Sequence, residues 1–143
     1  MHKTFFRVFL FSIFLFAGCK PENQKEQLKV QRFPNEDAPL ALLMREMFED
    51  LEEVKVAVGN GERIKSYVEK HRNLLEVKPT DPKVKTPIFH MMGEAYLESL
   101  ANLEESPLEL VKANYQTVIN TCLGCHQQYC PGPVKRIQQL EID

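Results

Sequence analysis

Residues 108–129 read LELVKANYQTVINTCLGCHQQY, and their apolar positions recur at alternating spacings of three and four residues. This period matches the 3.6 residues of a helical turn, so the stretch predicts an amphipathic helix with one face towards a core. Ser106 followed by Pro107 is typical of a helix start. The predicted seam places two cysteines on the buried face and consists of Leu108, Val111, Tyr115, Val118, Cys122, Cys125 and Tyr129.

Three earlier stretches show the same helical period. Residues 40–58, 62–77 and 86–105 each carry an apolar stripe; glycines end the first of them and prolines end the second. No stretch shows the two-residue alternation of a strand, and a short helix is predicted for residues 134–140. Four helices with short connections predict an all-α fold, an antiparallel four-helix bundle.

The start of the chain has the features of a bacterial lipoprotein signal peptide, which we predict for residues 1–18. Lys3 and Arg7 give a basic start, and the apolar run that follows is too short to span a membrane. The run closes on Ala17 and Gly18 before Cys19, which resembles a lipobox, so lipid attachment is predicted at Cys19. Cleavage of an ordinary signal peptide nearby is the alternative. Either way the chain is expected to be exported; with the lipid it is anchored to a bacterial membrane and faces the periplasm.

The remaining chain is expected to form one tether and one domain. Residues 19–38 are polar and contain two prolines, which is typical of a flexible tether, and residues 39–143 suffice for a single domain. Removal of the signal peptide takes away two basic residues and no acidic one, so the formal net charge falls from -2 to -4. This charge gives no reason to expect a nucleic-acid partner.

Cys122, Cys125 and His126 form the pattern Cys-x-x-Cys-His. This spacing lets two thiols bond to the vinyl groups of one haem while the adjacent imidazole binds the iron. A thioredoxin-like dithiol would follow a strand and begin a helix, and a zinc ribbon would need a second pair of ligands. The sequence therefore predicts a c-type cytochrome with one covalent haem c near the C-terminal end of the last helix. His126 is the expected axial ligand of its iron.

The arrangement resembles the class II cytochromes c, the cytochrome c-prime and c-556 group, whose four-helix bundle carries Cys-x-x-Cys-His near the end of the last helix. The resemblance covers residues 40–129, and residues 44–55, MREMFEDLEEVK, are similar to the family pattern around the distal haem position. It implies Met44 as the second metal ligand. Leu40 stands where the family usually has an arginine, and Cys130 where it usually has a basic residue. The chain is thus identified as a divergent member with a lipoprotein signal.

Other assignments of the second axial position stay open. Met47 lies one turn after Met44, and a five-coordinate iron with an apolar distal pocket is a further alternative. His71 would allow a bis-histidine site, although we predict His71 and His90 to be surface or boundary residues. The acidic side chains of residues 46–53 are expected to form a solvated face, with docking of a basic redox partner as a second interpretation.

The predicted function is the transport of single electrons on the periplasmic side of a membrane. No catalytic constellation is needed for this function, so we expect a carrier and not an enzyme. One alternative is a five-coordinate haem protein that binds nitric oxide or carbon monoxide, and another is a haem-free structural or redox lipoprotein. The expected partners are redox proteins and, through the N-terminal lipid, a membrane. A homodimer stays open, as does Cys130, which could be a free thiol, an intermolecular disulfide or a second anchor.

Overall fold

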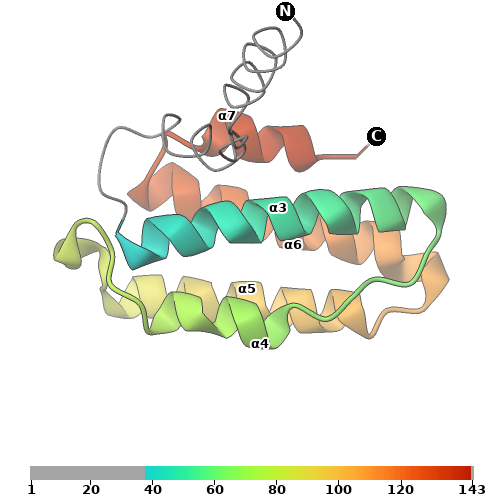
Figure 1. Cartoon of the computed structure of the whole chain (residues 1–143), viewed down its shortest axis with the longest axis horizontal. Coiled ribbons are helices and arrows are strands. Elements are labelled where there is room, and N and C mark those ends of the chain that lie inside the picture. Colours follow the sequence, from blue (N-terminus) through green and yellow to red (C-terminus); the bar gives the residue numbers. More distant parts are fainter. Residues whose placement is uncertain (1–37, 143) are drawn as a thin grey trace, which may run out of the picture. The chain divides into compact units, whose positions relative to one another are not determined.

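The computed structural model describes residues 38–142, and within this range it contains helices, turns and loops but no strand (Figure 1). The predicted all-α class is therefore confirmed for the described residues. The signal peptide, Cys19 and almost all of the predicted tether lie outside them. Among the described helices, none combines the length and apolarity that a membrane crossing requires. The elements in order are α3 (Pro39–Asn60), α4 (Val68–His71), η1 (Arg72–Leu75), η2 (Pro82–Val84), α5 (Pro87–Glu104), α6 (Leu108–Tyr129), α7 (Val134–Ile137) and η3 (Gln138–Leu140).

Helix α3 follows the predicted apolar stripe closely. Pro39 occupies its first turn, where the missing N–H is no loss, and Gly61 ends it with a φ of 67°, which glycine adopts without steric cost. Met44, the predicted second metal ligand, is only partly buried, although it packs against the core. The buried side chains of α3 are Leu40, Leu43, Met47, Phe48, Leu51, Val54 and Val58.

The second predicted helix is shorter than expected. Residues 62–67 have no regular secondary structure, and α4 begins only at Val68. The carboxylate of Glu104, on α5, accepts hydrogen bonds from the backbone N–H groups of Tyr67 at 2.6 Å and Val68 at 3.1 Å. These bonds satisfy donors that every helix start leaves unpaired. The prediction of a helix from residue 62 was wrong because the cap of α4 comes from a distant part of the chain.

Helices α5 and α6 run antiparallel, and two side-chain contacts define their register. The hydroxyl groups of Ser99 and Thr121 lie 3.3 Å apart, and those of Thr86 and Tyr129 lie 2.9 Å apart. Thr86 also caps α5, because its hydroxyl oxygen accepts the N–H of Phe89 at 3.1 Å. Tyr96 lies between Thr86 and Ser99 on α5, so it is level with the part of α6 that carries the cysteines.

The buried face of α6 departs from the predicted seam at its first position. Leu108 is 65% exposed, because it begins the helix at the end of the domain, beyond the packed interior. The buried side chains of α6 are Val111, Tyr115, Val118, Ile119 and Leu123, and Cys122 and Tyr129 pack partly buried against the same core.

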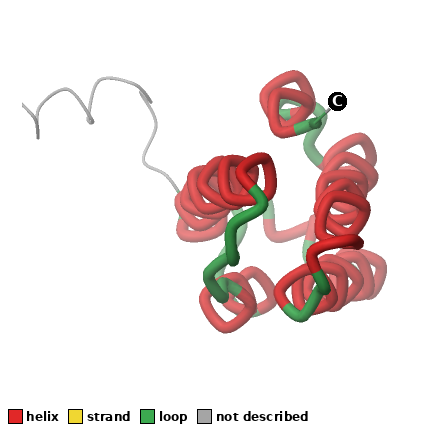
Figure 2. Tube along the Cα trace, turned by 90° about the vertical axis from the view of Figure 1, so that its right-hand side faces the viewer, coloured by secondary structure: helices red, strands yellow, loops and turns green. Residues whose placement is uncertain are grey.

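The C-terminal tail forms the predicted short helix and lies along α3 and α6. Ile137 and Leu140 are buried, and the hydroxyl of Tyr115 donates a hydrogen bond to the backbone carbonyl of Leu140 at 2.8 Å. The guanidinium group of Arg136 lies 4.2 Å from the ring centroid of Phe48, a cation–π contact. Figure 2 views the domain from one end and shows the helical segments side by side, with the loops at their ends.

Candidate functional site

Both cysteines of the predicted motif lie in the last turns of α6. Cys122 and Cys125 are half-buried, and Cys122 packs against the apolar core. Burial raises the pKa of the Cys122 thiol to about 12, and the neighbouring Cys125 adds to this rise. Burial also raises the pKa of Cys125. The thiolate is the reactive form of a redox dithiol, so these thiols, at the negative end of a helix dipole, do not have the environment of one.

His126 is oriented by the turn that follows α6. Its Nδ1 lies 3.1 Å from the backbone carbonyl oxygen of Cys130, and because a carbonyl only accepts, Nδ1–H is the donor. Nε2 then keeps its lone pair, which is the tautomer that binds a metal through Nε2. Burial lowers the pKa of His126, partly offset by the hydrogen bond to Cys130, so the neutral imidazole is favoured. Two thiols and one available imidazole nitrogen are the donor set that a haem c requires.

The methionine candidates lie on α3. Figure 1 shows the N-terminal end of α3 and the C-terminal end of α6 at the same end of the domain. Met44 is in the second turn of α3, and His126 is in the last turn of α6. Met44 is half-buried, whereas Met47 is 6% exposed and belongs to the core. The fold therefore brings the elements of Met44 and His126 to one end of the domain.

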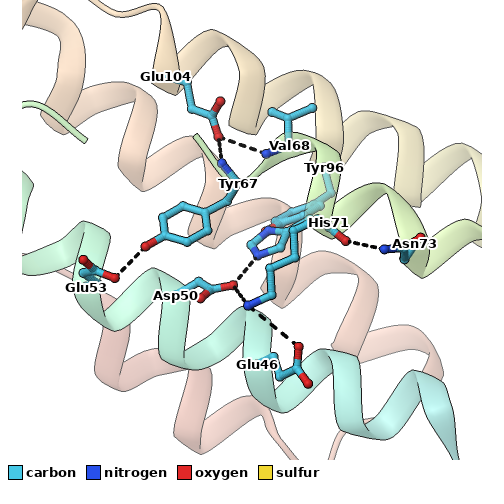
Figure 3. Close-up of polar contacts among 10 residues, drawn as sticks. Glu46, Asp50, Glu53, Tyr67, Val68, His71, Asn73, Tyr96 and Glu104 are labelled. Atoms are coloured by element: carbon cyan, nitrogen blue, oxygen red, sulfur yellow. Dashed lines mark hydrogen bonds and ion pairs between the residues drawn. The ribbon is translucent and has the colours of Figure 1, made fainter. Parts of the chain in front are cut away.

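A second polar group, which the sequence did not reveal, crosses the interior between α3, α4 and α5 (Figure 3). His71 is fully buried; its Nδ1 lies 2.7 Å from the hydroxyl of Tyr96 and its Nε2 lies 2.9 Å from a carboxylate oxygen of Asp50. The prediction that His71 is a surface or boundary residue was therefore wrong. Asp50, expected on a solvated face, has a side chain only 14% exposed. His90 is exposed, as predicted.

The Asp50–His71–Tyr96 cluster has a defined pattern of donors. Burial lowers the pKa of His71 more than the hydrogen bond to Asp50 raises it, so the ring is neutral near pH 7. Its Nε2–H donates to the Asp50 carboxylate, and its Nδ1 accepts from the Tyr96 hydroxyl. Burial raises the pKa of Tyr96 well above its ordinary value, which keeps that hydroxyl protonated. The helical spacing of His71 within an apolar stripe was the one sequence signal for its burial.

Lys70 connects this cluster to the surface. Its ammonium group lies 2.6 Å from the Asp50 carboxylate and 3.7 Å from that of Glu46. The ring of Tyr67 stacks on His71 at a centroid distance of 5.7 Å, and its hydroxyl donates to Glu53 at 2.6 Å. Several acidic side chains of α3 thus have structural partners, while Glu49 and Glu52 are exposed as predicted.

Comparisons of the chain with protein-family models, with curated proteins and with solved structures find no match. Within residues 38–142, no three or more histidine, cysteine, aspartate or glutamate side chains form a group that could hold a metal ion by themselves. A haem differs from such a centre, because its porphyrin supplies four iron ligands and the protein supplies one or two. The case for a haem therefore depends on Cys122, Cys125 and His126.

Proposed function

We propose that this protein is a c-type cytochrome that carries single electrons through one covalently attached haem near the C-terminal end of α6. The hydrogen bond from His126 Nδ1 to the Cys130 carbonyl oxygen supports this proposal most directly. It holds the imidazole in the tautomer that presents Nε2 to an iron, and both thiols of the motif lie on the same helix within about one turn. Neither a redox dithiol nor a buried structural cysteine requires such a histidine.

The arrangement of helices supports membership of the class II cytochromes c. With α4 and η1 counted together as the second helix, α3, α5 and α6 complete the four helices of an antiparallel bundle. In this proposal the haem lies at the end of the bundle where α3 begins and α6 ends. Met44 would then be the ligand opposite His126, as the resemblance implies.

Each residue of the site has a separate task in electron transfer. Cys122 and Cys125 would hold the haem through thioether bonds, and His126 and Met44 would bind the iron through Nε2 and Sδ. The bound haem supplies the chemistry, a reversible one-electron change of its iron. Leu43, Met47 and Phe89 are buried and exclude water from the interior of the domain. Exposed acidic side chains on α3 would attract a basic redox partner.

The optical spectrum of the full chain, produced in a bacterial host that attaches haem c, tests the proposal. We expect haem absorption that stays with the polypeptide in acidic organic solvent, because thioether bonds survive this treatment and axial ligation does not. The reduced protein should show the narrow bands of a low-spin, six-coordinate haem. Haem that is extracted completely, or a protein without haem, would contradict the proposal and favour a structural lipoprotein.

A five-coordinate haem that binds nitric oxide or carbon monoxide is the second candidate function. It is favoured by the surroundings of Met44, which packs against the apolar core that includes Leu40, Leu43 and Phe48. If Met44 does not bind the iron, these residues would line an apolar distal pocket. Immediate binding of carbon monoxide by the reduced protein distinguishes this function from electron transfer.

The proposed place of action depends on Cys19. Cys19→Ala should prevent lipid addition, since no other residue can supply the thiol that a lipoprotein signal requires at this position. The variant should appear as an unlipidated precursor or as a form released from the membrane, measured by mass spectrometry and by fractionation. An unacylated N-terminus at another residue of the unmodified protein would show that an ordinary signal peptide precedes the domain.

A further inference from the structure

The Asp50–His71–Tyr96 cluster forms a continuous path of hydrogen bonds from the domain surface into its core. Lys70, at the surface, donates to Asp50 at 2.6 Å, and Asp50 accepts from His71 at 2.9 Å. Nδ1 of His71 then lies 2.7 Å from the hydroxyl of Tyr96. The exposed fractions of these two residues are 0% and 5%. Three separate elements, α3, α4 and α5, contribute these side chains (Figure 3). Burial of such polar groups would destabilise the fold unless all of them were hydrogen-bonded. Their complete pairing is therefore a specific feature of this fold.

The inner end of this path lies at the level of Cys122 along the neighbouring helix α6. The contacts Ser99–Thr121 and Thr86–Tyr129 set the register of α5 against α6, and Tyr96 then falls level with Cys122. A negative charge on Cys122 would also raise the pKa of Tyr96. A haem attached through Cys122 would therefore be held at the level of the inner end of the path.

We propose that the Asp50–His71–Tyr96 cluster binds a proton when the attached haem is reduced and releases it when the haem is oxidised. The inference rests on the proposed function, because it needs a haem at Cys122 and Cys125. Addition of one electron makes the haem more negative by one charge. In a poorly solvated interior, a new negative charge favours the protonated form of a nearby base. His71 Nδ1 is the basic lone pair within the cluster.

The step balances with one electron and one proton. A reduced donor protein supplies the electron to the haem iron, and the solvent supplies the proton to Nδ1 of His71. The Tyr96 hydroxyl, which donates to Nδ1 in the neutral state, then rotates so that its oxygen accepts the new Nδ1–H. Oxidation of the haem by an acceptor protein reverses both transfers, and no covalent bond to carbon or sulfur changes.

The charged groups around His71 act in opposite directions on its protonation. Asp50 from α3 and Glu104 from α5 favour the protonated ring, while Lys70 on its own helix and burial oppose it. The aromatic ring of Tyr67 stacks on His71 and the hydroxyl of Tyr96 contacts its Nδ1, both as neutral partners. On α6, a charge on Cys122 would interact with Tyr96. Burial dominates, so the pKa of His71 lies below its ordinary value of 6.5. Reduction should raise this pKa.

The test is the reduction potential of the haem-containing full chain as a function of pH. Between the His71 pKa of the oxidised protein and that of the reduced protein, reduction takes up a proton, so the potential should fall as pH rises. For complete coupling, each tenfold decrease in proton concentration lowers the potential by about 59 mV. Haem propionates titrate as well, so the decisive quantity is the difference in pH dependence of the potential between the unmodified protein and its variants.

The variant His71→Gln should lose this pH-dependent fall, because a glutamine side chain can donate to Asp50 and accept from Tyr96 but does not titrate. The matched control His90→Gln makes the same exchange at an exposed position of α5 and should keep it. An unchanged pH dependence in His71→Gln, or a flat potential in the unmodified protein, would overturn the inference.

A second measurement on the unmodified protein covers the case in which His71→Gln does not fold. Ring-nitrogen NMR of His71 should give a higher pKa in the reduced than in the oxidised protein, and equal values would overturn the inference. A sample without the haem absorption band would instead overturn the proposed function and the inference together. A haem-containing protein whose His71 does not respond to reduction overturns the inference alone.

Discussion

A chain in which Cys122→Ser and Cys125→Ser are combined should contain no covalently bound haem. A serine hydroxyl does not form the thioether bond with a haem vinyl group, so any haem that remains is held only by axial ligands. The two positions are half-buried and tolerate a slightly smaller polar side chain, so we expect the helical domain to survive. The measurement is haem absorption of the polypeptide after denaturation in acid, which should fall from one haem per chain to none.

Cys130→Ser is the matched control for this experiment. Cys130 is an exposed free thiol at the end of α6, and its contribution to the site is the backbone carbonyl that accepts from His126. The substitution preserves this carbonyl, so covalent haem should be retained in full. If the double variant keeps covalent haem, or if Cys130→Ser loses it, the assignment of the two attachment residues is incorrect.

Helix content could be predicted from the sequence wherever one apolar stripe determines the structure. The stripes of residues 40–58 and 86–105 correspond to α3 and α5 because burial of a continuous apolar face dominates their energetics. The start of α4 was missed because the capping carboxylate belongs to Glu104, more than thirty residues further along the chain. The exposure of Leu108 was missed because a repeat does not reveal where the core ends.

The haem attachment motif and the Asp50–His71–Tyr96 cluster differ in the same way, because one depends on local sequence and the other on distant residues. Cys122, Cys125 and His126 are neighbours in the sequence, so their spacing alone predicts a haem attachment motif. His71 has partners on α3 and α5, and no local sequence pattern predicts its hydrogen bonds with Asp50 and Tyr96. Asp50 stands among exposed acidic residues and differs from them only by its place on the helix. Sites whose residues come from several helices can therefore be identified only from the tertiary structure.

Met44→Ala should convert a low-spin, six-coordinate haem into a high-spin haem that binds carbon monoxide readily. If the Met44 sulfur is the second axial ligand, its removal leaves the iron with His126 and weakens the ligand field. Because Met44 is only half-buried, the loss of packing should be small beside this spectral change. The measurement is the absorption spectrum of the oxidised and reduced variant, followed by addition of carbon monoxide.

Met47→Ala is the matched control, with the same exchange one turn further along α3. Met47 is 6% exposed and belongs to the core, so its truncation should lower the free energy of unfolding by about 2 to 5 kcal/mol and leave the spin state unchanged. Opposite results for the two variants would assign the ligand to Met47. Unchanged absorption bands in both variants would show that neither methionine binds the iron. An unmodified reduced protein that binds carbon monoxide at once would lead to the same conclusion. The apolar residues around Met44 would then form the pocket of a gas-binding haem protein.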